Sequence, residues 1–106
     1  MLDAVLAALA DPTRRRVVEL LGEGPKRAGV LSTAVNASPP AMSRHLRILL
    51  HAGLVVDERV PEDARARVFR LRPESVVALQ AWLDQLKAHW DEQLASFQRH
   101  AEGKPK

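Results

Sequence analysis

The sequence predicts a mostly α-helical domain with one small β-hairpin. Apolar residues recur at spacings of three and four through most of the chain, as on one face of a helix. Short apolar and Arg-rich runs replace that pattern only over residues 54–71, and 106 residues is the length of a single domain. The expected order is helix, helix, helix, helix, strand, strand, helix. We therefore expect one winged helix-turn-helix domain over residues 1–102, with a frayed tail over 103–106.

Three short helices are predicted before residue 37. The first covers residues 2–10, where the apolar spacing is carried by Leu2, Val5, Leu6 and Leu9. Asp11-Pro12 is a helix start, with Asp11 as the cap, and this second helix runs to Leu21. Its Arg14-Arg15-Arg16 run is interpreted as a solvated helix start. A third helix fits residues 27–35, with an inward face of Val30, Leu31 and Val35.

The segment NASPPAMSRHLRILLHAGLVV, residues 36–56, predicts the helix that reads DNA. Ser38 is the expected cap, Pro39 suits the first helical position, and Gly53 stops the helix. One face is apolar, with Met42, Leu46, Leu49 and Leu50. The opposite face carries Pro40, Ser43, Arg44 and Arg47. No Asp or Glu lies between Glu23 and Asp57, whereas this gap holds Lys26, Arg27, Arg44 and Arg47, as expected of a surface that lies on phosphates.

The hairpin is predicted from strands over residues 54–60 and 66–71, joined by a turn over 61–65. A long final helix then opens at Pro73-Glu74 and ends at Gly103. Its apolar stripe consists of Leu79, Leu83, Leu86, Trp90, Leu94 and Phe97. Trp82 lies on a neighbouring stripe. So broad an apolar surface on one helix favours a second subunit as its partner, hence a homodimer.

These elements predict a binding site for double-stranded DNA. The first half of the helix over 38–52 would enter the major groove, where Arg44 reads a guanine edge and Ser43 assists. Arg47 and Arg27 suit backbone phosphates, and Arg65 and Arg67 are the expected contacts of the wing. The full set of predicted DNA contacts is Ser38, Pro40, Ser43, Arg44, Arg47, Arg27, Arg65 and Arg67. The predicted dimer contacts are Leu2, Val5, Leu6, Leu9, Leu83, Trp90, Leu94 and Phe97.

Several functions are disfavoured by what the chain lacks. It has no Cys and no Tyr, and it has no Gly-rich phosphate loop, HExxH or Gly-x-Ser-x-Gly motif, so we expect neither an enzyme nor a cofactor. The apolar start is too short to span a membrane, which favours a cytoplasmic protein without a membrane partner. Two alternatives remain open. One is a winged-helix module that binds an acidic protein through the basic face. The other is a metal-responsive regulator that uses His89 and His100.

Three stretches carry a family resemblance: LAALADPTRRRVVELL, SPPAMSRHLRILLHAGLV and RARVFRLRPE. They resemble the winged helix-turn-helix repressors of the ArsR/SmtB family, over residues 2 to about 100. The resemblance implies a homodimer built from the first and last helices. It also implies two reading helices in successive major grooves of a palindromic operator, and repression that an inducer relieves.

The chain departs from the metal-sensing members of that family. Those members place Cys where this chain has Val30-Leu31-Ser32-Thr33. The family's zinc site on the last helix matches only in the gap between His89 and His100. Lys87 stands at its Asp position and Gly103 at its Glu position. The chain therefore resembles the metal-independent branch, which implies no metal and no cofactor.

Overall fold

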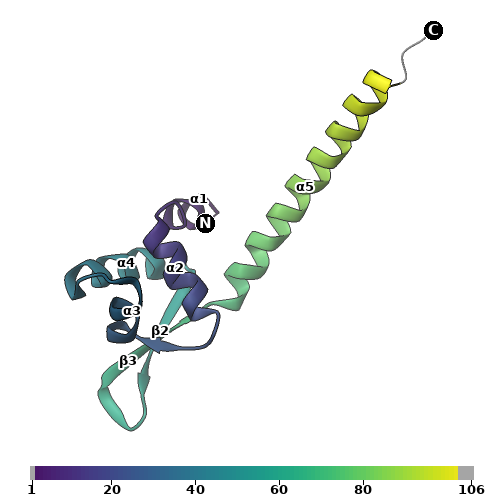
Figure 1. Cartoon of the computed structure of the whole chain (residues 1–106). Coiled ribbons are helices and arrows are strands. Elements are labelled where there is room, and N and C mark those ends of the chain that lie inside the picture. The colour runs from purple at the N-terminus through teal and green to yellow at the C-terminus, as the bar shows by residue number, and fades with distance from the viewer. Residues whose placement is uncertain (1, 103–106) are drawn as a thin grey trace. The chain divides into compact units, whose positions relative to one another are not determined.

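The computed structural model describes residues 2–102, apart from the side chains of Ala64 and Arg65. The chain divides into two compact units, Met1–Val76 and Val77–Lys106. The first holds four helices, a small sheet and the beginning of α5 (Pro73–Glu102), which continues as one uninterrupted helix through the second (Figure 1). The expected order of elements is confirmed, with one additional strand. The predicted frayed tail over 103–106, including Gly103, lies outside the described residues.

The first two helices are joined by arginine side chains. α1 (Leu2–Ala8) is shorter than the predicted helix over 2–10, whereas α2 (Pro12–Leu21) begins as expected, with the Asp11 side chain accepting a hydrogen bond from the Arg14 amide at 3.0 Å. Arg14 Nε donates to the carbonyl of Ala8 at 2.7 Å, and Arg15 Nη1 donates to the carbonyl of Leu9 at 2.9 Å. Both side chains satisfy carbonyls at the end of α1 that the helix itself leaves unpaired. The expectation of a solvated run is wrong for the half-buried Arg14, whereas Arg15 and Arg16 are exposed as expected.

The two helices of the helix-turn-helix are α3 (Ala28–Val35) and α4 (Pro39–His51). Asn36 ends α3 in the left-handed conformation, with φ of 56°. Gly53 follows α4 with φ of 79°. There the amide of Gly53 donates to the Leu50 carbonyl and that of Leu54 to the Leu49 carbonyl, both at 3.1 Å, the pattern of a Schellman motif. The predicted turn and the predicted stop are both confirmed.

The sheet has three antiparallel strands in the order β1-β3-β2. β2 (Val55–Val60) and β3 (Asp63–Leu71) form the predicted hairpin, but its turn is shorter than residues 61–65, because β3 begins at Asp63 and the register shifts at Val60. The additional strand is β1 (Lys26–Arg27), in which Lys26 pairs with Phe69. β1 ties the segment before α3 to the wing.

The core lies in the first unit. Its largest fully buried side chains are Leu31, Met42, Leu49, Leu54, Val17 and Val55. Val30 was expected to face inward and is instead 54% exposed, because Leu31 occupies the inward side of this short helix. Val5, predicted as a dimer contact, is only 6% exposed and belongs to the core of its own chain. By contrast, α5 contains no buried residue within its described range.

Candidate nucleic-acid interface

The beginning of α4 has few free backbone donors. Ser38 Oγ accepts a hydrogen bond from the Ala41 amide at 3.3 Å, as the sequence predicts. Pro39 and Pro40 occupy the first turn and carry no N–H group. Because the first-turn donor that remains is already capped, this end of α4 offers pyrrolidine rings rather than amides. Polar recognition by α4 therefore depends on side chains further along the helix.

The outward face of α4 presents Pro40, Ser43, Arg44 and Arg47, all of them exposed. Met42, Leu46 and Leu49 are buried on the other side and fix the rotation of the helix. Within the described part of the chain, neither Arg44 nor Arg47 has a hydrogen-bond or ion-pair partner. An exposed guanidinium without an internal partner keeps its five donors for a ligand, and it suits the oxygens of phosphates and the edge of guanine.

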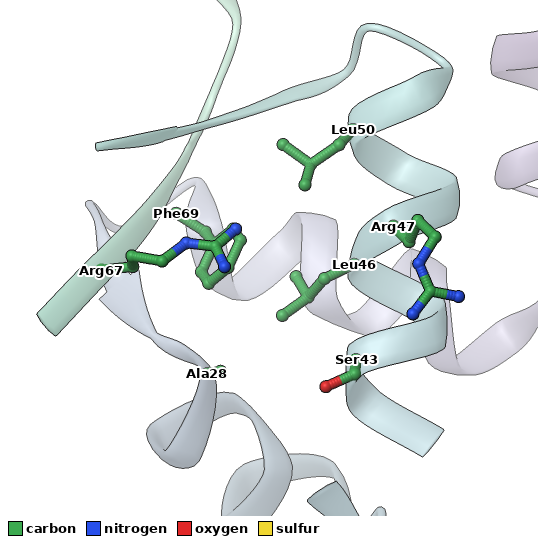
Figure 2. Close-up of a pocket in the computed structure, with 7 residues that line it drawn as sticks. All are labelled: Ala28, Ser43, Leu46, Arg47, Leu50, Arg67 and Phe69. Carbon is green, nitrogen blue, oxygen red and sulfur yellow. The ribbon is translucent and has the colours of Figure 1, made fainter. Parts of the chain in front are cut away.

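A cleft separates α4 from the wing. It has a volume of about 430 Å³ and is lined by Ala28, Ser43, Leu46, Arg47, Leu50, Arg67 and Phe69. Ser43, Leu46 and Leu50 point from α4 toward the strand that carries Arg67 and Phe69, whereas Arg47 leaves α4 on another side (Figure 2). The apolar floor, with Arg47 and Arg67 at its border, makes this cleft a basic, solvent-open surface. We call it the wing cleft.

Other basic residues in this region are partly neutralised. Lys26 Nζ lies 3.4 Å from the Glu23 carboxylate. Arg67 pairs with Asp57 and stacks on Phe69, with 5.2 Å between its guanidinium carbon and the ring centroid. Arg27 is exposed and, among the described residues, has no such partner. The side chain of Arg65 lies outside the described residues. The arginines with the least internal engagement are thus on α4 and at the start of α3.

Comparisons with known proteins agree with this geometry. Residues 11–56 match the family described as bacterial regulatory protein, arsR family. The chain is 40% identical over 95 residues to the HTH-type transcriptional regulator Rv2034 of Mycobacterium tuberculosis, which covers 90% of this chain and 83% of that one. The chain belongs to the arsR family. It is also 42% identical over 55 residues to the transcriptional repressor SdpR of Bacillus subtilis, covering 52% of this chain and 61% of the repressor.

Solved structures show the same fold. An ArsR-like transcriptional regulator from Rhodococcus sp. RHA1 superimposes with a TM-score of 0.76 at 31% identity, covering 92% of this chain and 90% of that one. The homodimeric winged helix-turn-helix DNA-binding domain of Mb0332 from Mycobacterium bovis gives a TM-score of 0.65 at 26% identity, covering 99% and 85%. This arsR-family chain is therefore a winged helix-turn-helix transcriptional regulator, in which α3 and α4 form the helix-turn-helix and β2 and β3 the wing.

A polar link connects the reading helix of this arsR-family regulator to α2. Arg14 Nη1 lies 3.3 Å from His45 Nδ1, and Asp11 Oδ2 lies 4.0 Å from the same nitrogen. Because an arginine N–H can only donate, the contact with Arg14 is a hydrogen bond when Nδ1 is unprotonated, whereas a protonated Nδ1 faces the Asp11 carboxylate. The sequence pattern does not predict this link. Its signal is non-local, because the two residues are 31 positions apart.

The two histidines of the metal-responsive alternative belong to the second unit. His89 and His100 are both exposed on α5. Eleven helical steps separate them by about 16 Å along the axis. Among residues 2–102 there is no group of three or more His, Cys, Asp or Glu side chains arranged to hold a metal ion. The same search range contains no helix with the length and apolar character needed to cross a bilayer.

Proposed function

We propose that this chain is a homodimeric transcriptional repressor that binds a palindromic operator in the cytoplasm and is released by an inducer. One observation carries the proposal: the outward face of α4 holds two exposed arginines without internal partners. In each copy, Arg44 reads a guanine in the major groove and Ser43 assists it. Arg47 and Arg27 bind backbone phosphates and set the position of the helix.

The wing has a smaller part in this proposal. Arg65 and Arg67 lie two positions apart on β3, and Arg67 already shares its charge with Asp57. A phosphate would have to compete with that carboxylate. Wing contacts therefore add to the affinity for DNA but do not determine which operator sequence is bound. Ser38 and Pro40 approach the duplex at the beginning of α4, where the Ser38 hydroxyl keeps its O–H donor and Pro40 contributes shape.

The dimer is supported by the second unit. The apolar stripe of α5 is exposed at Leu83, Trp90, Leu94 and Phe97, and Phe97 reaches 71%. Helices with such a stripe are stable when a partner covers it. The relative Mb0332 is homodimeric. Further predicted contacts are Leu2 and Leu6 on α1 and Leu9 directly after it. Repression, rather than activation, is supported by the similarity to the repressor SdpR.

Arg44→Ala tests the proposal. The operator is selected from a random duplex library, and binding is measured by fluorescence anisotropy. We expect the Kd to rise about 5- to 150-fold, because one bidentate contact to guanine is worth ~1–3 kcal/mol. Discrimination at the guanine position should relax at the same time. The control Arg99→Ala removes an equal charge from α5 and should leave the Kd near that of the wild type. Equal Kd values for all three proteins, or no selected sequence, would contradict the proposal.

A further inference from the structure

A second cavity adjoins the other side of α4, between this helix and α1. It has a volume of about 380 Å³, within the range of small-molecule sites. Its lining consists of Ala4, Ala7, Ala8, Arg14, Arg47, Ile48, His51 and Ala52. Four of these residues are alanines, so no large side chain fills the space. We call it the α1–α4 cavity.

The chemistry of the lining selects a ligand class. The walls are methyl groups of alanine and the side chain of Ile48, whereas the polar groups are all basic: Arg14, Arg47 and His51. No acidic residue lines the cavity. Arg14 is already engaged with the Ala8 carbonyl, but Arg47 and His51 have no hydrogen-bond partner within the described residues. An apolar pocket with uncompensated positive charge at its border complements a small amphipathic anion.

The cavity is separate from the predicted dimer face of α1. At 100° per residue, Ala4 and Ala7 lie on the side of α1 roughly opposite Leu2, Leu6 and Leu9. A second copy that covers the leucines therefore leaves the alanines accessible. The cavity does, however, share one residue with the DNA-binding side. Arg47 lines both the α1–α4 cavity and the wing cleft.

We propose that the α1–α4 cavity binds a small amphipathic carboxylate and that this ligand is the inducer. The apolar chain lies against the alanines and Ile48, and the carboxylate pairs with Arg47 and His51. The pairing draws Arg47 away from the phosphate that it binds on DNA, so ligand and operator compete for one guanidinium. The role of this ligand as the inducer rests on the proposed repressor function, whereas its binding in the α1–α4 cavity does not.

Octanoate is the probe for the binding site, and 1-octanol is its neutral match. Each is titrated into the 106-residue chain, below its micelle-forming concentration, while backbone amide shifts are followed by NMR. We expect octanoate to shift amides of α1 and of the second half of α4 and to bind at least tenfold more tightly than 1-octanol. Ala7→Phe should abolish the shifts by filling the cavity, and Ala4→Leu provides a smaller filler if that variant fails to fold. Ala88→Phe, the same change on α5, should bind as the wild type does.

Arg47→Gln tests the contribution of the Arg47 charge to ligand binding separately from the contribution of the cavity volume. It should weaken octanoate binding about tenfold, as expected for loss of a charge-assisted contact of ~1.4 kcal/mol, and leave 1-octanol binding unchanged. Equal affinity for the two probes, or shifts spread along α5, would overturn the site. Shifts that appear only in a monomeric variant would mean that a second copy occupies the cavity, which also overturns it.

Competition is then measured with the selected operator. Octanoate at saturation should raise the operator Kd at least tenfold for the wild type and for Ala88→Phe. It should not do so for Ala7→Phe, which keeps every proposed DNA contact. A Kd that does not respond while the amides shift would overturn the inducer role and leave the binding site. A wild-type chain that binds no duplex at all would refute the repressor proposal instead. The NMR titration would still show whether octanoate binds in the α1–α4 cavity.

Discussion

At the scale of single residues, Asp11 connects α2 to the reading helix α4. Its side chain caps α2 by accepting a hydrogen bond from the Arg14 amide, and it lies near His45 on the reading helix. The backbone hydrogen bond from Arg14 is the main reason why the pKa of Asp11 is held below its ordinary value, and the charge of the Arg14 guanidinium adds to it. The carboxylate form is therefore the stabilising one.

Asp11→Ala should lower the free energy of unfolding by ~1 kcal/mol at pH 7, the usual value of an N-cap. Since the pKa of Asp11 is depressed in the folded state, its contribution is present above the unfolded pKa and is lost as the pH falls through the folded one. The difference between wild type and variant should therefore shrink below about pH 4. Urea denaturation at fixed protein concentration, at pH 7 and pH 3, measures it. Asp11→Asn keeps an acceptor and should lose less at pH 7; a pH-independent difference for Asp11→Ala would contradict the argument.

At the scale of elements, local sequence signals were sufficient to predict α2 and α4. Each begins with a capping side chain followed by proline, and each has an apolar face that ends at glycine or at a turn. The outward residues Ser43, Arg44 and Arg47 follow from that rotation, so this face of the candidate site was predictable. β1 was not, because a strand of two residues has no periodicity and exists only through its pairing with β3. The α1–α4 cavity was equally hidden, since it depends on the packing of two helices that are far apart in sequence.

Gly53 marks the boundary between the reading helix and the wing. Its φ of 79° lies in the left-handed region, and its carbonyl accepts a hydrogen bond from the Ser75 hydroxyl at the start of α5. One residue thus ends α4, directs the chain into β2 and anchors the first turn of α5. A side chain at this position is strained because its Cβ approaches the following carbonyl.

Gly53→Ala should destabilise the protein by ~1–2 kcal/mol because of that strain. Thermal unfolding followed by circular dichroism should show a Tm lowered by several degrees, about 4–8 °C per kcal/mol for a unit of this size. Gly29→Ala is the matched control, since an added Cβ there meets nothing within 4 Å. Alanine is also the better helix former, so this control should be neutral or slightly stabilising. Equal losses in both variants would show that the conformation at Gly53 is not the cause.

At the scale of the whole molecule, the proposed function requires two copies. One reading helix supplies a few base contacts, whereas two helices held one DNA turn apart, ~34–36 Å, contact both halves of a palindrome. The second unit is suited to this role rather than to the core, because its described residues include no buried side chain and its stripe is exposed. The affinity for the operator and the association of the two chains are therefore linked.

Trp90→Glu tests that link. Trp90 is 58% exposed near the middle of the stripe, and a carboxylate there would be buried without a partner in the dimer, so monomers should predominate. Multi-angle light scattering gives the mass, and circular dichroism checks that the helices persist. The operator Kd should rise by at least about 100-fold, since half of the base contacts, worth ~1–3 kcal/mol for each base pair, are lost.

Ala88→Glu places the same charge on the opposite side of α5 and should remain dimeric with a near wild-type Kd. A Trp90→Glu variant that stays dimeric would place the interface elsewhere, whereas a monomer with unchanged affinity would show that one reading helix suffices for binding.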